Sequence, residues 1–133
     1  SALIIKFALD MTSKEKKRKT IYHLGSCSTC KTILKTLPLK GCEIREIKTQ
    51  KISEAELDDL ARLAGSYELL FSRKAVKYRT LNLKDKKLSE KDIRKLILSE
   101  YTFLRRPVMV IGDQIFIGNA TAQVNAARAA LDH

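Results

Sequence analysis

The chain has 133 residues, of which 44% are hydrophobic, and this is enough for one domain with its own apolar core. Its three cysteines are too few for the disulfide framework of a small secreted protein, and no apolar run approaches the ~18 residues of a membrane span. We therefore expect a cytoplasmic protein with no membrane contact. The formal net charge of +11 favours an anionic partner, either an oxyanion, a nucleic acid or an acidic protein surface.

The first residues differ from the rest of the chain. Met11 and the polar residues after it resemble a natural start, which would make residues 1–10 an upstream extension, and the opening segment lacks the basic stretch of a secretory signal. The basic block at residues 14–19 is either a solvated leader or an arm that binds nucleic acid. Because no aromatic residues alternate with these lysines, we expect a solvated leader and no direct nucleic-acid binding. We assign residues 1–19 to an N-terminal extension and residues 20–133 to a single domain.

The next part of the chain predicts a strand, a helix and a second strand. Residues 20–24 are apolar and typical of a strand, residues 28–37 have apolar positions at helical spacing, and Pro38 with Gly41 ends that helix. Residues 42–47 alternate apolar and polar side chains as a strand does. The inward side of this strand is predicted to carry Cys42, Ile44 and Ile47.

The middle of the chain predicts helices. Two serines are each followed three residues later by an acidic residue, the pattern of a capping box at a helix start: Ser53 with Glu56, and Ser89 with Asp92. Gly65 is placed to end the first of these helices. Between them, the irregularly apolar residues 67–83 are expected to hold a third helix. The helical segment covers about residues 52–104.

The last part of the chain returns to strands. After Pro107, residues 108–111 and 115–117 read as a β-hairpin, with Gly112 suited to the first position of a type II′ turn, and residues 120–131 form a closing helix. The order is β-α-β, a helical insertion, then β-β-α. This order predicts an α/β protein with a thioredoxin-like, glutaredoxin-like fold, in which helices cover a mixed sheet.

The most informative motif is the Cys-x-x-Cys pair formed by Cys27 and Cys30, at the junction between the first strand and the first helix. Unpaired backbone amides and the helix dipole stabilise a thiolate at a helix start, so we expect Cys27 to be a nucleophile with a lowered pKa. Cys30 is then placed to resolve a covalent intermediate by forming a disulfide. The amides of Ser28, Thr29 and Cys30 are expected to bind the substrate anion.

Structural explanations of the same residues stay open. The cysteine pair could be buried packing or half of a zinc site, but the only further candidate ligands are Cys42, His23 and His133, and their spacing does not suit zinc. We therefore expect no bound metal. Cys42 is expected to be a small core residue.

Other residues are expected near the pair. His23 either favours the Cys27 thiolate or ends the strand without a role. The bond before Pro107 is of the type that can be cis, which would place Pro107 opposite the cysteine loop with its backbone available to a substrate. We expect Arg106 to bind an oxyanion and Arg105 to be a solvated charge.

Three separated signatures together resemble the arsenate reductase/Spx family, which contains the glutaredoxin-coupled arsenate reductases and their relatives. They are Ile-Tyr-His at 21–23 leading into Cys-Ser-Thr-Cys-Lys at 27–31, Leu-Leu-Phe-Ser-Arg at 69–73 running through Tyr78 to Leu-Asn-Leu at 81–83, and Leu-Arg-Arg-Pro-Val at 104–108. The resemblance covers residues 20–131. It implies a thioredoxin-like fold with a helical insertion, in agreement with the order of elements above.

The resemblance also implies roles for individual residues. Cys27 matches the position that attacks the oxyanion, Arg73 and Arg106 match arginines that bind it, and His23 matches a histidine that tunes the nucleophile. The sequence departs from the reductases at Cys30, where they usually have no cysteine, and after the last strand, where they carry a further arginine and this chain has Ile117-Gly118-Asn119. Both departures resemble the Spx branch, whose members are redox-sensing transcription regulators that bind the C-terminal domain of the RNA polymerase α subunit.

The leading hypothesis is a thiol-redox protein whose Cys27 attacks an arsenate-like oxyanion or a protein disulfide. It needs no bound cofactor and receives electrons from glutathione with glutaredoxin, or from thioredoxin. The alternative hypothesis is an Spx-like regulator that contacts RNA polymerase.

Overall fold

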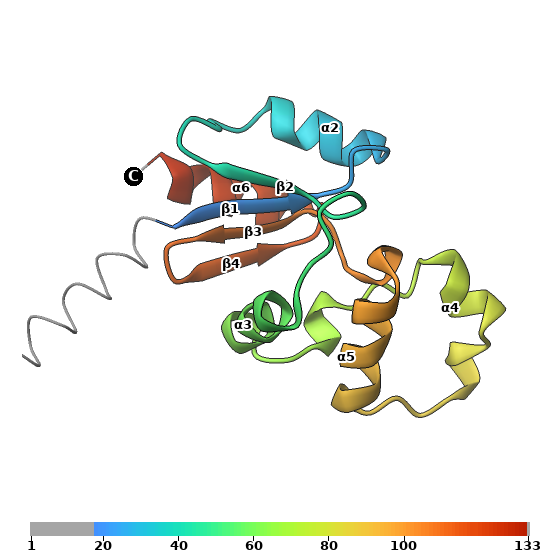
Figure 1. Ribbon diagram of the computed structural model, residues 1–133. Coiled ribbons are helices and arrows are strands. Elements are labelled where there is room, and N and C mark those ends of the chain that lie inside the picture. The colour runs from blue at the N-terminus through green and yellow to red at the C-terminus, as the bar shows by residue number, and fades with distance from the viewer. Residues whose placement is uncertain (1–17, 133) are drawn as a thin grey trace, which may run out of the picture.

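The computed structural model describes residues 18–132. The expected start at Met11, most of the basic block and His133 lie outside these residues. A sheet with helices on both faces forms one side of the molecule, and a group of shorter helical segments extends from the other side (Figure 1).

The sheet has four strands in the order β2-β1-β3-β4. Its first two strands, β1 (Lys19–His23) and β2 (Glu43–Glu46), are parallel and are joined by the crossover helix α2 (Ser28–Lys35). The antiparallel neighbour of β1 is β3 (Val108–Ile111), which forms a hairpin with β4 (Gln114–Ile117). Gly112 in the hairpin turn has a φ of +64°, as the type II′ prediction requires. The predicted mixed sheet is confirmed.

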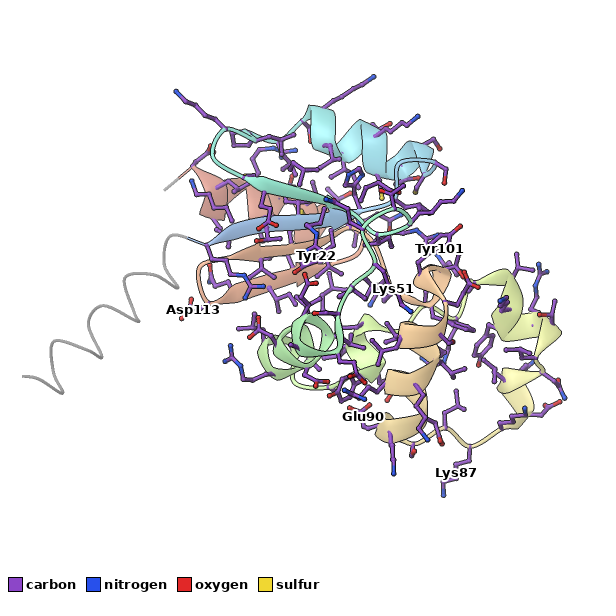
Figure 2. The ribbon with its side chains drawn as sticks, viewed as in Figure 1. Tyr22, Lys51, Lys87, Glu90, Tyr101 and Asp113 are labelled. Atoms are coloured by element: carbon purple, nitrogen blue, oxygen red, sulfur yellow. The ribbon has the colours of Figure 1, made fainter. Side chains whose placement is uncertain are left out.

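Alternation along the strands divides the core between the two faces of the sheet. On one face, Ile21, Met109 and Ile111 pack against α2 and the closing helix α6 (Thr121–Leu131). On the other face, Tyr22, Val108 and Val110 pack against the helical insertion. Tyr22 lies between the sheet and this insertion (Figure 2), and its hydroxyl donates a hydrogen bond of 3.1 Å to Glu56. The insertion is therefore part of the core.

The main helices of the insertion, α3 (Glu54–Ala64) and α5 (Glu90–Ser99), begin at the predicted capping boxes. Each serine side chain accepts a hydrogen bond of 3.1 Å from the amide of its acidic partner. Gly65 ends α3 with a φ of +102°, a conformation that glycine adopts without steric cost. The sequence predictions for these two helices are confirmed.

The third helix expected within residues 67–83 is present but covers only a small part of this range. The range consists of the short helix α4 (Val76–Thr80) between two 3-10 turns, η1 (Glu68–Leu70) and η2 (Leu83–Asp85). Phe71, directly after η1, is extended because it pairs with Leu104, which follows the turn η3 (Tyr101–Phe103). The amide of Ser72 donates to the carbonyl of Phe103 at 2.7 Å, and the amide of Arg105 donates to that of Leu70 at 2.8 Å. This non-local pairing replaces the helical hydrogen bonds.

The prediction for the inward side of β2 is correct only in part. Ile47 is buried, Cys42 is half-buried, and Ile44 is 37% exposed. Because β2 is the outer strand of the sheet, the packing helices do not cover Ile44 fully.

Candidate active site

Cys27 is the residue that caps the start of α2, directly after the loop that leaves β1. Its own amide donates to the carbonyl of Leu24 at 3.0 Å, and its carbonyl accepts from Lys31 at 3.1 Å, which fixes the backbone on both sides of the thiol. The amides in the first turn of a helix have no partner within the helix. The side chain of Cys27 is therefore held beside donors that favour a negative charge.

The surroundings lower the pKa of Cys27. Burial alone would raise it, but the amides of Cys30 and Thr29, the thiol of Cys30 and the positive charge of Arg106 act in the opposite direction and together outweigh burial. Cys27 is only partly buried, so its sulfur is also accessible. A lowered pKa and accessibility are the two properties of a reactive thiol.

Cys30 has the opposite character. Its side chain is fully buried, and burial together with the neighbouring Cys27 raises its pKa to about 11. Both cysteines are free. Cys27 is thus the more acidic thiol of the pair, and Cys30 stays protonated to higher pH. This asymmetry distinguishes a candidate nucleophile from a candidate resolving thiol.

A cleft of about 570 Å³ opens beside Cys27. It lies between the start of α2, the extended part of the insertion and the segments that flank the β3–β4 hairpin. Its lining comprises Cys27, Thr29, Ser66, Glu68, Leu69, Phe71, Ser72, Arg73, Lys74, Arg105, Arg106, Gly118 and Asn119. Four of these side chains are cationic and one is acidic, so the cleft favours an anion.

Arg106 is the half-buried cation of this cleft. Its Nη1 donates to the carbonyls of Thr102 at 3.2 Å and Leu104 at 3.3 Å. Its Nε is buried and has no partner among residues 18–132, so the guanidinium is fixed in place and still has an unused donor. Arg106 also contributes directly to the lowered pKa of Cys27.

Arg73 lines the cleft from the insertion, and its side chain is 48% exposed. Its Nη2 lies 3.0 Å from a carboxylate oxygen of Glu68, and its guanidinium lies over the ring of Phe71, 5.5 Å from the ring centre. Because Glu68 neutralises part of its charge, Arg73 attracts an anion less strongly than Arg106 does.

The fold brings Cys27, Thr29, Arg73 and Arg106 to the cleft, with Cys30 buried behind Cys27. His23, Ser28 and Pro107 do not line it. The bond between Arg106 and Pro107 is cis, as the sequence allowed, but Pro107 is buried and its carbonyl accepts from Gly118 at 2.9 Å. His23 ends β1 with a buried Nδ1 that lacks a partner among residues 18–132.

Sequence analysis missed part of the cleft. Arg105, expected to be a solvated charge, lines it together with Lys74 and Asn119. The position of Arg105 follows from the pairing of its backbone with Leu70 across a long stretch of chain, and no local pattern in the sequence carries that information. Its only sequence signal is its place next to Arg106.

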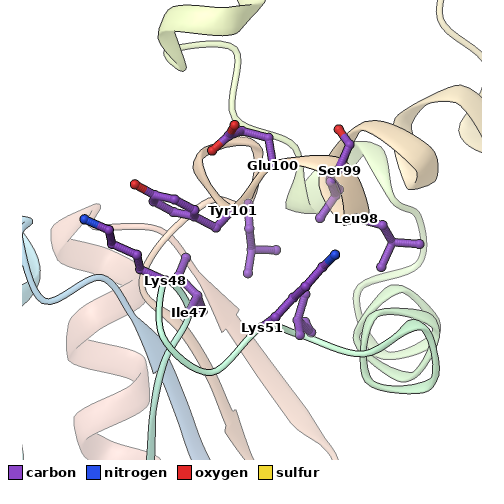
Figure 3. A pocket seen from close by; sticks show the side chains of 10 residues that line it. Ile47, Lys48, Lys51, Leu98, Ser99, Glu100 and Tyr101 are labelled. Atoms are coloured by element: carbon purple, nitrogen blue, oxygen red, sulfur yellow. The ribbon is translucent and has the colours of Figure 1, made fainter.

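A second cavity, of about 160 Å³, lies between the segment after β2 and the end of α5 (Figure 3). Lys48, Lys51, Glu100 and Tyr101 surround it, and it contains no cysteine. Within residues 18–132 there is no group of three or more side chains suited to holding a metal ion, and no helix there is long and apolar enough to cross a membrane.

Residues 22–127 match the model of the ArsC family. The chain belongs to the ArsC family. It is 34% identical over 104 residues to the uncharacterized protein YusI of Bacillus subtilis and 32% identical over 102 residues to an arsenate reductase of Haemophilus influenzae, and each match covers 74% of this chain and 88% of the relative.

Solved structures of this family have the same fold. An arsenate reductase from Vibrio cholerae superposes with a TM-score of 0.71 at 24% identity, over 83% of this chain and 97% of that one. The protein SACOL0876 of Staphylococcus aureus superposes with a TM-score of 0.67 at 29% identity, over 81% and 96%. The thioredoxin-like fold with a helical insertion, expected from the order of elements, is confirmed.

Proposed function

We propose that the protein is a thiol oxidoreductase that reduces an arsenate-like oxyanion, with Cys27 as the nucleophile and Cys30 as the resolving thiol. The observation that carries this proposal is the pair of unlike thiols at the wall of a cationic cleft. Membership of the ArsC family and similarity to an arsenate reductase support the choice of an oxyanion.

In the first step the Cys27 thiolate attacks the As(V) centre. A sulfur–arsenic bond forms, and one oxygen leaves as water after protonation. The guanidinium of Arg106, which lines the cleft, and the amides at the start of α2 bind the remaining oxygens in this proposal, because their negative charge would otherwise repel the thiolate. Arg73 adds a second positive charge at the outer wall.

In the second step Cys30 gives up its proton and attacks the sulfur of Cys27. A Cys27–Cys30 disulfide forms, and the electron pair of the broken sulfur–arsenic bond passes to arsenic, which leaves as As(III). Cys30 lies in the first turn of the helix that Cys27 caps, and the two thiols affect each other's pKa, which supports Cys30 as the neighbour that attacks this sulfur. Two electrons from glutathione with glutaredoxin, or from thioredoxin, then reduce the disulfide.

The test is arsenate-dependent NADPH consumption, measured with glutathione, glutaredoxin and glutathione reductase, and separately with thioredoxin and its reductase. Turnover should require Cys27, and Cys27→Ser should lower it at least about a thousandfold because serine is not ionised at neutral pH. Cys42→Ser is the matched control, since Cys42 lies outside the cleft. Equal activity of the Cys27→Ser variant and the native protein would contradict the proposal.

A protein disulfide is the other substrate that the same thiolate could attack. Insulin reduction with thioredoxin reductase or glutathione reductase as the electron source separates the two cases. Turnover of insulin without turnover of arsenate would mean that the substrate is a protein disulfide and not an oxyanion. The roles of Cys27 and Cys30 would stay the same.

A redox-sensing regulator is the second candidate function, and the two free thiols at the start of α2 favour it because oxidation to a disulfide needs no bound substrate. If this function holds, RNA polymerase α subunit should be retained by the oxidised protein and by the reduced protein to different extents, and Cys27→Ser should abolish the difference. Equal retention in both states would reject it.

A further inference from the structure

The segment that follows β4 passes unusually close to Arg105. A Cβ atom added to Gly118 would lie 2.8 Å from Nη2 of Arg105 and 3.5 Å from its Cζ. Gly118 also has a φ of +89°, which side chains rarely adopt, and its amide is fixed by the hydrogen bond to Pro107. The absence of a side chain at Gly118 leaves the space in which the guanidinium of Arg105 lies.

The backbone holds Arg105 firmly, whereas its guanidinium makes few contacts. The amide of Arg105 donates to Leu70 at 2.8 Å, but the side chain makes one long hydrogen bond of 3.4 Å, from Nη1 to the carbonyl of Leu69. No acidic side chain pairs with it within residues 18–132, in contrast to Arg73, which pairs with Glu68. Since a guanidinium has five N–H donors, most of those on Arg105 are unused.

This arrangement does not suit a purely structural role. One long bond to a carbonyl contributes little to stability, and an exposed charge without a partner contributes nothing through ion pairing. The guanidinium nevertheless lies in the lining of the cleft that contains Cys27 and Arg106. Its uncompensated charge raises the local concentration of anions there.

We propose that Arg105, seated against Gly118, is a specificity-determining residue that binds the outer oxygen atoms of the anion on which Cys27 acts. This proposal rests on the proposed reaction of Cys27 with an anion. Arg106 and the helix amides bind the side of the anion nearest the sulfur, and Arg105 binds the side that faces the mouth of the cleft.

The test compares two alkylating reagents at Cys27: iodoacetate, which is anionic, and iodoacetamide, which is neutral. Modification is followed at Cys27 by peptide mass spectrometry. Arg105→Gln should lower the ratio of the iodoacetate rate to the iodoacetamide rate by about threefold to tenfold, because one nearby charge is lost in a partly solvated site. The iodoacetamide rate itself should change little, since Cys30, Thr29 and Arg106 are the groups that lower the pKa of Cys27.

Arg79→Gln is the matched control, because it removes the same charge from an exposed arginine that does not line the cleft. If Arg105→Gln and Arg79→Gln change the ratio equally, the proposal is wrong. Arg105→Lys should give an intermediate ratio, since a lysine keeps the charge but loses the planar fork.

Gly118→Ala tests whether the space beside Gly118 positions the guanidinium of Arg105. It should lower the ratio as Arg105→Gln does, and adding it to Arg105→Gln should produce no further fall, because no guanidinium is left to displace. Circular dichroism monitors folding of the Gly118→Ala variant. The comparison of Arg105→Gln with Arg79→Gln does not depend on that variant.

The alkylation ratio also separates this proposal from the proposed function. A fall in the ratio without arsenate turnover would keep Arg105 as an anion-binding residue and reject arsenate as the substrate. Arsenate turnover with an unchanged alkylation ratio would keep arsenate as the substrate and reject Arg105 as an anion-binding residue. If both hold, Arg105→Gln should raise the KM for arsenate more than it lowers kcat.

Discussion

The two walls of the cleft are built in different ways. The thiol wall comes from a short stretch of chain at the start of α2, where Cys27, Thr29 and Cys30 supply the nucleophile, the amides and the second thiol. The cationic wall is assembled from distant segments, with Arg73 in the insertion and Arg105 and Arg106 before β3. Reactivity of the thiol is thus a mainly local property, whereas recognition of the anion depends on tertiary packing.

Arg106 is the one arginine of the cleft that contributes to both properties, so its removal should have the largest effect among the arginines. Arg106→Gln removes a charge that lowers the pKa of Cys27 and a proposed donor to the oxyanion. We expect oxyanion turnover to fall by about 10- to 100-fold, the scale for loss of one preorganised electrostatic contact. The pH midpoint of Cys27 alkylation should rise at the same time. An unchanged midpoint would mean that Arg106 binds the oxyanion but does not lower the pKa of Cys27.

Phe71→Leu should disturb the cationic wall and spare the thiol wall. Phe71 is buried, stacks on Phe103 with ring centres 5.3 Å apart and forms the bridge to Leu104. The smaller side chain should lower the free energy of unfolding by about 1–2 kcal/mol through lost packing. Urea unfolding measures this, and the alkylation ratio should fall about threefold while the midpoint of Cys27 stays in place. A shift in the midpoint would show that the two walls are coupled.

Arg73→Gln should have a smaller effect than Arg106→Gln, since Arg73 is half-exposed and paired with Glu68. We expect the KM for the oxyanion to rise by about twofold to threefold with kcat nearly unchanged, as for a screened surface charge. Steady-state kinetics at low and moderate salt check this, because the difference should shrink as salt increases. A loss as large as that of Arg106→Gln would reverse the ranking of the two arginines.

Cys30 gives the smallest and most specific effect, a change in stability with pH. Its pKa is raised to about 11 in the folded protein, so the fold favours the neutral thiol. The stability that Cys30 contributes should be fully present below the unfolded pKa of about 8.5 and be lost as pH rises toward the folded value. Chemical unfolding under reducing conditions should show this loss in the native protein and not in Cys30→Ala. If the free energy of unfolding depended on pH in the same way in the native protein and in Cys30→Ala, the raised pKa of Cys30 would be contradicted.

The same difference between the walls explains what the sequence could predict. The strand, the helix start and the cysteine pair are neighbours in the chain, so residues 20–37 suffice to place Cys27 at a helix terminus. The capping boxes at Ser53 and Ser89 are local signals as well, and both helices begin there.

The cationic wall could be predicted only in part. Arg73 and Arg106 follow from the resemblance to a family, whereas Arg105 is expected to be solvated although it lines the cleft. The extended backbone at Phe71 depends on its pairing with the distant Leu104, and the irregularly apolar residues 67–83 contain no local pattern that predicts it. The close approach of Gly118 to Arg105 is likewise a tertiary contact.

The pH dependence of Cys27 alkylation by iodoacetamide tests the central claim most directly. If Cys30, Thr29 and Arg106 together outweigh burial, the rate should reach half of its maximum at a pH clearly below the reference thiol value of about 8.5. A midpoint at or above that value would mean that Cys27 is not held as a thiolate near neutral pH, and would contradict its role as the nucleophile.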